Sequence, residues 1–216
     1  MSNSTKAQDL FFDNYLDASC RLNELEEFRQ YVGNYLGEEE RYLRDEAHVD
    51  LEIGFLPLFA ETFPPILHSS LIISTVILLE MEVKGYAEAL RRVRNLNLGY
   101  NDLSGSLIER FRKYVTVIGG IQVPVKKFHW ADIVAVFEIR NALVHNGGML
   151  PAFPKANVIR SFESRHGTPI CTQDRMKITA ETSKTALDVA SSFIDAIYEA
   201  VDATPERREM RQASME

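Results

Sequence analysis

The stretch WADIVAVFEIRNALVHNGG, residues 130–148, decides the fold. Its apolar side chains recur every three or four positions, which is the periodicity of a helix that buries one broad face. Asn146, Gly147 and Gly148 follow, and an asparagine with two glycines is a strong signal for the end of a helix. We therefore predict a helix over residues 128–145 that ends at this turn.

Arg140 falls within the apolar arc of the predicted helix, so its guanidinium cannot simply face water. One interpretation is a buried ion pair, for which Glu80 is the candidate partner because it too shares a helix face with apolar residues. The other is a cation held at a cleft, where it would meet a phosphate. The two interpretations are compatible, because an acid can orient an arginine that also faces a ligand.

A separate face of the same helix carries Glu138, Asn141 and His145, because spacings of three, four and seven align on a helix. His145 could simply complement the helix dipole in the last turn. If it is exposed near Arg140, its imidazole could act as a general acid or base. Asn141 could orient that ring or bind a phosphate oxygen. Together with the charge of Arg140, these groups would suit attack of an RNA 2′-hydroxyl on its own phosphate, a route that requires no metal.

The rest of the chain predicts a mainly α-helical protein. A β-hairpin at about residues 157–179, before the last helix, is indicated by apolar runs on both sides of His166-Gly167-Thr168-Pro169. We expect one helical domain over residues 1–203, with an acidic helical segment at 1–60, and a flexible polar tail at 204–216. Helices are expected at 7–46, as one long helix or a pair broken near Gly37, and at 66–96, 106–117 and 183–203.

Charge is unevenly distributed along the chain, whose net charge is −7. Residues 1–60 hold 13 acids against 5 lysines and arginines, whereas residues 61–150 hold 8 acids against 10. The basic side chains of the middle are either solvated helix faces or a rim that holds phosphates. The candidate RNA-binding residues are Arg110, Arg112, Lys113, Lys126 and Lys127.

Several function classes find no support in the sequence. Cys20 and Cys171 are isolated, no zinc-ligand spacing is present and no phosphate-binding P-loop occurs, so we expect no metal and no cofactor. The most apolar run, residues 71–79, is shorter than the roughly 20 residues that cross a bilayer, and no signal peptide is evident. These features predict a cytoplasmic protein with no membrane partner.

The segment Arg140-Asn141-Ala142-Leu143-Val144-His145 resembles the signature of the HEPN superfamily (higher eukaryotes and prokaryotes nucleotide-binding domains). That signature is an arginine, often followed by a polar residue, with a histidine four to six positions later at a helix end. The preceding long helix, His68 to Leu90, resembles the corresponding helix of the family, and the resemblance covers roughly residues 66–148. Arg160 and His166 fit the looser spacing too, but they fall in the predicted hairpin.

The resemblance implies an RNxxxH-type HEPN helical bundle that acts as a homodimer, with two copies of the motif facing each other across a cleft. It implies a metal-independent endoribonuclease of a toxin–antitoxin or antiviral defence type, with RNA as substrate, and it allows for a cognate antitoxin or defence-system partner. Arg140 and His145 would be catalytic, and Asn141, Glu80 and Glu138 supporting. Some toxins of the family carry a modified tyrosine two residues after the histidine, where this chain has Gly147. The alternatives are a non-catalytic HEPN module that binds a nucleotide, RNA or protein, and an unrelated helical interaction protein.

Overall fold

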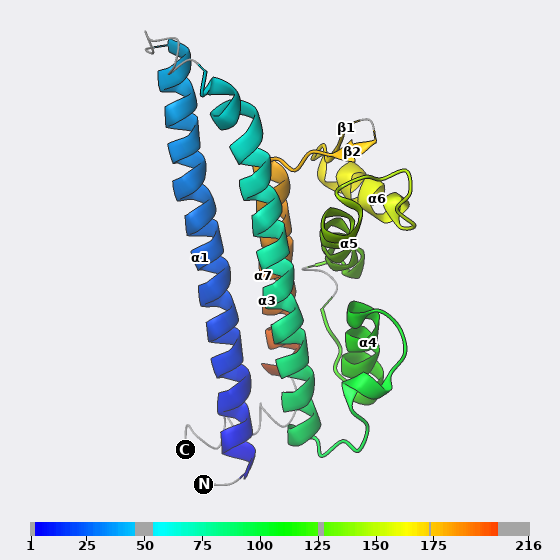
Figure 1. Cartoon of the computed structure of the whole chain (residues 1–216). Helices are drawn as coiled ribbons and strands as arrows, with labels where there is room; N and C mark the ends of the chain where they lie inside the picture. Colours follow the sequence, from blue (N-terminus) through cyan, green and yellow to red (C-terminus); the bar gives the residue numbers. More distant parts are fainter. Residues whose placement is uncertain (1–2, 46–53, 125–127, 173, 203–216) are drawn as a thin grey trace. The chain divides into compact units, whose positions relative to one another are not determined.

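A computed structural model describes residues 3–45, 54–124, 128–172 and 174–202, and in these ranges the protein is mainly helical (Figure 1). It forms six α-helices and one small antiparallel hairpin there, which confirms the predicted fold class at this level. The elements are α1 (Asn3–Asp45), α3 (Phe63–Val93), α4 (Leu107–Lys113), α5 (Trp130–Asn146), α6 (Ala156–His166), β1 (Cys171–Thr172), β2 (Arg175–Met176) and α7 (Ala180–Asp202). The predicted tail at 204–216 lies outside the described residues.

Helix α1 runs unbroken past Gly37, so the single-helix alternative is confirmed. Short-range ion pairs support its polar side: Arg29 binds Glu26 one turn earlier, and Arg44 binds Glu40. Pairs three or four residues apart stabilise a helix by a few tenths of a kcal/mol each, roughly 0.2–0.5. They help to carry the helix through a glycine that would otherwise weaken it.

The predicted hairpin at about 157–179 is only partly right, because its first half is helix α6. Ile159 and Phe162 are completely buried and lie three positions apart, a spacing that puts both on one face of a helix. Gly167, at φ 65°, ends α6 in the left-handed conformation that a helix C-terminus commonly adopts. The turn signal at 166–169 therefore marks the end of a helix and not a hairpin loop.

The strands themselves are two residues each, and Cys171 pairs with Met176. The chain just after α5 lies beside this hairpin, where the amide of Met176 donates to the carbonyl of Gly148 at 2.8 Å. The amide of Leu150 donates in turn to the carbonyl of Asp174 at 2.9 Å. The hairpin therefore holds the segment that follows the end of α5.

The chain divides into two compact units, and the divisions fall inside α1, α3, α5 and α7. Unit 1 comprises Met1–Arg21, Ile77–Ile133 and Val189–Glu216, and unit 2 comprises Leu22–Val76 and Val134–Asp188. Each is described by itself below. The predicted single domain over residues 1–203 stays a prediction.

Aromatic rings build the core of unit 1. Phe111 on α4 is buried and meets Tyr86 edge-on at 6.1 Å and Phe193 at 5.9 Å between ring centroids. Phe193 also receives Phe128 at 5.4 Å and Trp130 at 5.7 Å. Edge-to-face contacts of this kind add roughly 0.5–1.5 kcal/mol each beyond the burial of area. Phe193 is therefore the centre of this core.

Aliphatic side chains dominate the core of unit 2. Leu36 of α1 packs with Leu67 and Leu71 of α3, and all three are buried. Ile139 of α5 and Ile159 of α6 are completely buried as well. The unit is thus held together by helix faces whose apolar positions recur at helical spacing.

One helical stretch, Leu58–Val93, is long and apolar enough by length and composition to cross a membrane. It is longer than residues 71–79, on which the sequence argument against a membrane span rests. Half of its most apolar window is buried inside the protein. This feature by itself assigns no membrane role.

Candidate functional site

The site predicted from the sequence lies on the last two turns of α5, in unit 2. Arg140 is half-buried, and its Nη1 donates to Oδ1 of the adjacent Asn141 at 3.2 Å. Its Nε is buried and has no hydrogen-bond partner in the described part of the chain. A guanidinium has five N–H donors, so N–H groups of Arg140 other than the one bonded to Asn141 can donate to a ligand oxygen.

Asn141 is held from its other end by Glu138. The Asn141 Nδ2 lies 3.4 Å from Glu138 Oε2, a long hydrogen bond that turns the amide oxygen toward Arg140. Glu138 is buried, with a side chain 7% exposed, and Oε1 of its carboxylate accepts from Lys155 Nζ at 2.6 Å. The four side chains form one polar chain in the order Lys155, Glu138, Asn141, Arg140.

Glu138 thus has the supporting position expected of it, whereas Lys155 was not expected. Lys155 stands directly before α6 and is 17 positions from Glu138 along the chain. No periodicity within one helix connects residues so far apart. Only the path of the segment between α5 and α6 brings the ammonium group to the carboxylate.

His145 lies in the last turn of α5, one turn beyond Asn141, and its side chain is exposed. The structure gives its ring no hydrogen bond or ion pair with any described residue. The exposure meets one condition for a role in acid–base chemistry. On a helix, Asn141 lies between Arg140 and His145 in angular position, so a ligand that bridges the two would pass over the asparagine.

The turn after His145 closes the helix as the sequence predicts. Gly147 and Gly148 have φ of 57° and 78°, a region that favours glycine. The amide of Gly148 donates back to the carbonyl of Ala142 at 2.9 Å, and the side chain of Asn146 bonds to the carbonyl of Met149. Hydrogen bonds therefore fix the turn at the end of α5, and the exposed side chain of His145 takes no part in them.

Glu80, the other supporting residue, is half-buried on α3 and belongs to unit 1, whereas Arg140 belongs to unit 2. The ion pair between them stays a prediction. What the structure gives Arg140 is the contact to Asn141.

The candidate RNA-binding residues that the structure describes lie in unit 1. The guanidinium of Arg110 sits over the ring of Tyr100 at 4.8 Å, and that of Arg112 over Trp130 at 5.6 Å. Lys113 is exposed and lies 3.4 Å from the carbonyl of Ser104. Lys126 and Lys127 lie outside the described residues. The described arginines are thus partly engaged by aromatic rings, and their role as a phosphate-binding rim stays a prediction.

The prediction that Arg160 and His166 lie in the hairpin is wrong. Arg160 and His166 are on helix α6, and His166 is its last residue before a glycine, so the expected hairpin location does not separate them from the main motif. What does separate them is the surroundings of the histidine. The ring of His166 is half-buried and packs on Phe162 at 4.4 Å between centroids, whereas His145 is exposed.

Among the described residues, no group of three or more histidines, cysteines, aspartates and glutamates is arranged to hold a metal ion. In comparisons with protein-family models, curated proteins and solved structures, nothing matches this chain.

Proposed function

We propose that this protein is a HEPN-type endoribonuclease of a toxin or antiviral defence kind, which cleaves RNA without a metal at the end of α5. The observation that carries the proposal is the half-buried guanidinium of Arg140, which the adjacent Asn141 holds at 3.2 Å. It stands beside an asparagine fixed by Glu138, on the helix that ends at an exposed His145. A phosphodiester oxygen can accept hydrogen bonds from the other N–H groups of this guanidinium.

The proposed reaction is a transesterification within the RNA. The 2′-hydroxyl loses its proton to a neutral imidazole of His145, and the 2′-oxygen then bonds to the adjacent phosphorus. The bond from phosphorus to the 5′-oxygen breaks, and the leaving oxygen takes a proton from a protonated imidazole. The products carry a 2′,3′-cyclic phosphate and a 5′-hydroxyl. Arg140 stabilises the negative charge that develops on the non-bridging oxygens, and removing one such donor commonly costs about 10²–10³ in rate.

Two imidazoles in opposite protonation states serve this reaction best, so we propose that a homodimer places one His145 from each copy at the phosphate. Each copy then supplies one Arg140 as well. Asn141 is a positioning residue, because its amide oxygen accepts a hydrogen bond from Nη1 of Arg140.

The test is the rate of RNA cleavage with EDTA present for wild type, Arg140→Ala and His145→Ala. We expect each substitution to lower the rate by at least about 10². Arg160→Ala is the control, because it removes an arginine that precedes a histidine in the last turn of another helix, six positions earlier instead of five. Equal losses in Arg160→Ala and Arg140→Ala would contradict the assignment of the chemistry to α5.

The second candidate is a non-catalytic module that binds RNA or another partner. Its supporting observation is that the structure gives His145 and Arg140 no direct contact. If the wild type binds RNA and Arg140→Ala weakens that binding, while no cleavage occurs, this alternative replaces the first.

A further inference from the structure

Four exposed aromatic side chains follow one another along the part of α1 that belongs to unit 2. They are Phe28, Tyr31, Tyr35 and Tyr42, with exposed fractions of 51%, 79%, 51% and 44%. Their spacings of three, four and seven residues place all four on one side of the helix, which we call the aromatic face. Contiguous exposed apolar patches are uncommon on folded proteins and mark sites of interaction.

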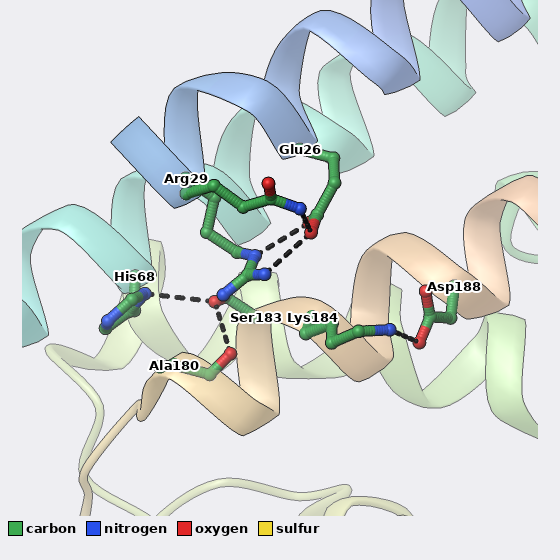
Figure 2. A network of polar contacts seen from close by, with 8 residues as sticks. Glu26, Arg29, His68, Ala180, Ser183, Lys184 and Asp188 are labelled. Atoms are coloured by element: carbon green, nitrogen blue, oxygen red, sulfur yellow. Dashed lines mark hydrogen bonds and ion pairs between the residues drawn. The ribbon is translucent and has the colours of Figure 1, made fainter. Parts of the chain in front are cut away.

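A different side of α1 is packed inside unit 2. Leu36 is buried there, and Arg29 donates through Nε and Nη2 to the two carboxylate oxygens of Glu26 at 2.7 and 2.6 Å (Figure 2). The charge of Arg29 acts on His68 of α3, whose Nδ1 lies 3.0 Å from Oγ of Ser183. These contacts hold the helix in the unit, and the aromatic face takes no part in them.

Exposed carboxylates accompany the aromatic face. Three glutamates each stand four positions, about one helical turn, before one of its rings: Glu24 before Phe28, Glu27 before Tyr31 and Glu38 before Tyr42. None of the three forms an ion pair with a described residue, whereas Glu26 is paired with Arg29 and Glu40 with Arg44. Residues 22–45 hold 7 acids against 3 arginines, so this surface is negatively charged.

The spacing and the charge together indicate what kind of partner fits this face. Apolar positions three, four and seven residues apart are the pattern by which one helix packs along another. From Phe28 to Tyr42 the helix extends about 21 Å, which matches about four turns of a second helix. A carboxylate one turn from an aromatic ring can hold an arginine or lysine both by ion pairing and by contact with the ring. The partner that fits is therefore a helix that is apolar on one side and basic at its edges.

Two other occupants fit this surface less well. A second copy of the chain would place the same acids on both sides of the contact, and like charges across an interface are unfavourable. Arg41 is the only cation of residues 22–45 without an ion pair to a described residue, so one arginine per copy would face several acids. Aromatic rings can stack on the bases of RNA, but the glutamates would repel its phosphates.

We propose that the aromatic face of α1 binds a basic amphipathic helix of another protein. Apolar side chains of that helix pack on the four rings, and its arginines or lysines lie at Glu24, Glu27 and Glu38. The proposal does not depend on RNA cleavage at α5. A contact with one helix is smaller than the roughly 800 Å² per partner of a standard stable complex, so we expect a dissociation constant of about 10–100 µM.

The test uses the full chain and two synthetic helical peptides of about three heptads each. One peptide has leucine at its a and d positions and arginine at its e and g positions, and the other has glutamate in place of the arginines. In calorimetry we expect the arginine peptide to bind and the glutamate peptide to bind at least about tenfold more weakly. The double variant Tyr31→Ala/Tyr35→Ala should lose at least about tenfold in affinity for the arginine peptide, because it removes two anchor rings and keeps good helix formers.

Matched controls separate this face from general attraction between a basic peptide and an acidic protein. Val117→Ala should leave binding unchanged, because Val117 is 73% exposed and lies outside the aromatic face. Glu27→Gln should weaken binding, whereas Glu181→Gln, which removes an exposed acid on α7, should not. Equal losses in these controls, or no binding of the arginine peptide at about 1 mM, would overturn the proposal.

The competing occupants are tested with the same double variant. We expect Tyr31→Ala/Tyr35→Ala to have the oligomeric state of the wild type in analytical ultracentrifugation. Self-association of the wild type that this variant loses would assign the face to a second copy and overturn the proposal. Binding of a single-stranded RNA that the variant loses would overturn it in favour of RNA.

Discussion

Replacing Lys155 with methionine should destabilise the protein, because the buried carboxylate of Glu138 stays in place and loses its cation. The substitution removes the cation 2.6 Å from Glu138 and leaves the carboxylate, 7% exposed, without its partner. Breaking a fully buried pair in this way costs about 3–5 kcal/mol, and an exposed pair contributes about 0–1. Because the Lys155 side chain is 49% exposed, we expect an intermediate loss of about 2 kcal/mol in the free energy of unfolding.

The assay is urea unfolding at pH 7 of the single variant and of Glu138→Gln/Lys155→Met. The double variant should recover to within about 1 kcal/mol of wild type, because no buried charge remains in it. Lys184→Met is the control, since Lys184 and Asp188 form an exposed pair at 2.5 Å with side chains 51% and 62% exposed. A loss below about 0.5 kcal/mol in Lys155→Met, or a double variant no more stable than the single one, would refute the reasoning.

Three further predictions concern other residues. The two hydrogen bonds from Arg29 hold the pKa of Glu26 at about 2, below its usual 4.5. The ionised carboxylate therefore stabilises the fold above pH 4.5, and this contribution, about 1–2 kcal/mol, is lost as the pH falls toward 2. Between pH 6 and pH 3, the free energy of urea unfolding should change less with pH in Glu26→Gln than in wild type, and an identical pH dependence would contradict this. Burial, with the charge of Glu163, raises the pKa of the Cys171 thiol to about 11. The exposed Cys20 should therefore react with iodoacetamide at pH 8 well before Cys171, and equal rates by mass spectrometry would contradict this. Phe193→Ala should cost about 3–5 kcal/mol in urea unfolding, because this ring is the centre of the aromatic core, and a cost below about 1 would show that core to be wrongly described.

Much of the helical arrangement follows from sequence periodicity. The helix over 128–145 was predicted within a few residues of α5, because buried positions repeat at helical spacing and two glycines end it. The sequence predicts a hairpin at about 157–179, because apolar runs flank the turn His166-Gly167-Thr168-Pro169. In the fold, Ile159 and Phe162 are buried on one helix face, so tertiary packing and not turn chemistry decides this segment.

The polar network was predictable only where it stays on one helix. Asn141 and Glu138 are three positions apart, and helical geometry alone brings them together. Lys155 and the contact of His68 with Ser183 join segments 17 and 115 positions apart. These contacts depend on the path of the chain between the elements, and that path cannot be predicted from a local sequence pattern.

If α5 carries the RNA-cleaving site, the chemical groups at the ends of the RNA fragments identify the reaction. Wild-type protein is incubated with RNA in EDTA, and the fragments are analysed by mass spectrometry. We expect fragments that end in 2′,3′-cyclic phosphates and 5′-hydroxyls, and no fragments from His145→Ala under the same conditions. Fragments with 3′-hydroxyl and 5′-phosphate ends, or cyclic-phosphate ends that persist in His145→Ala, would contradict it.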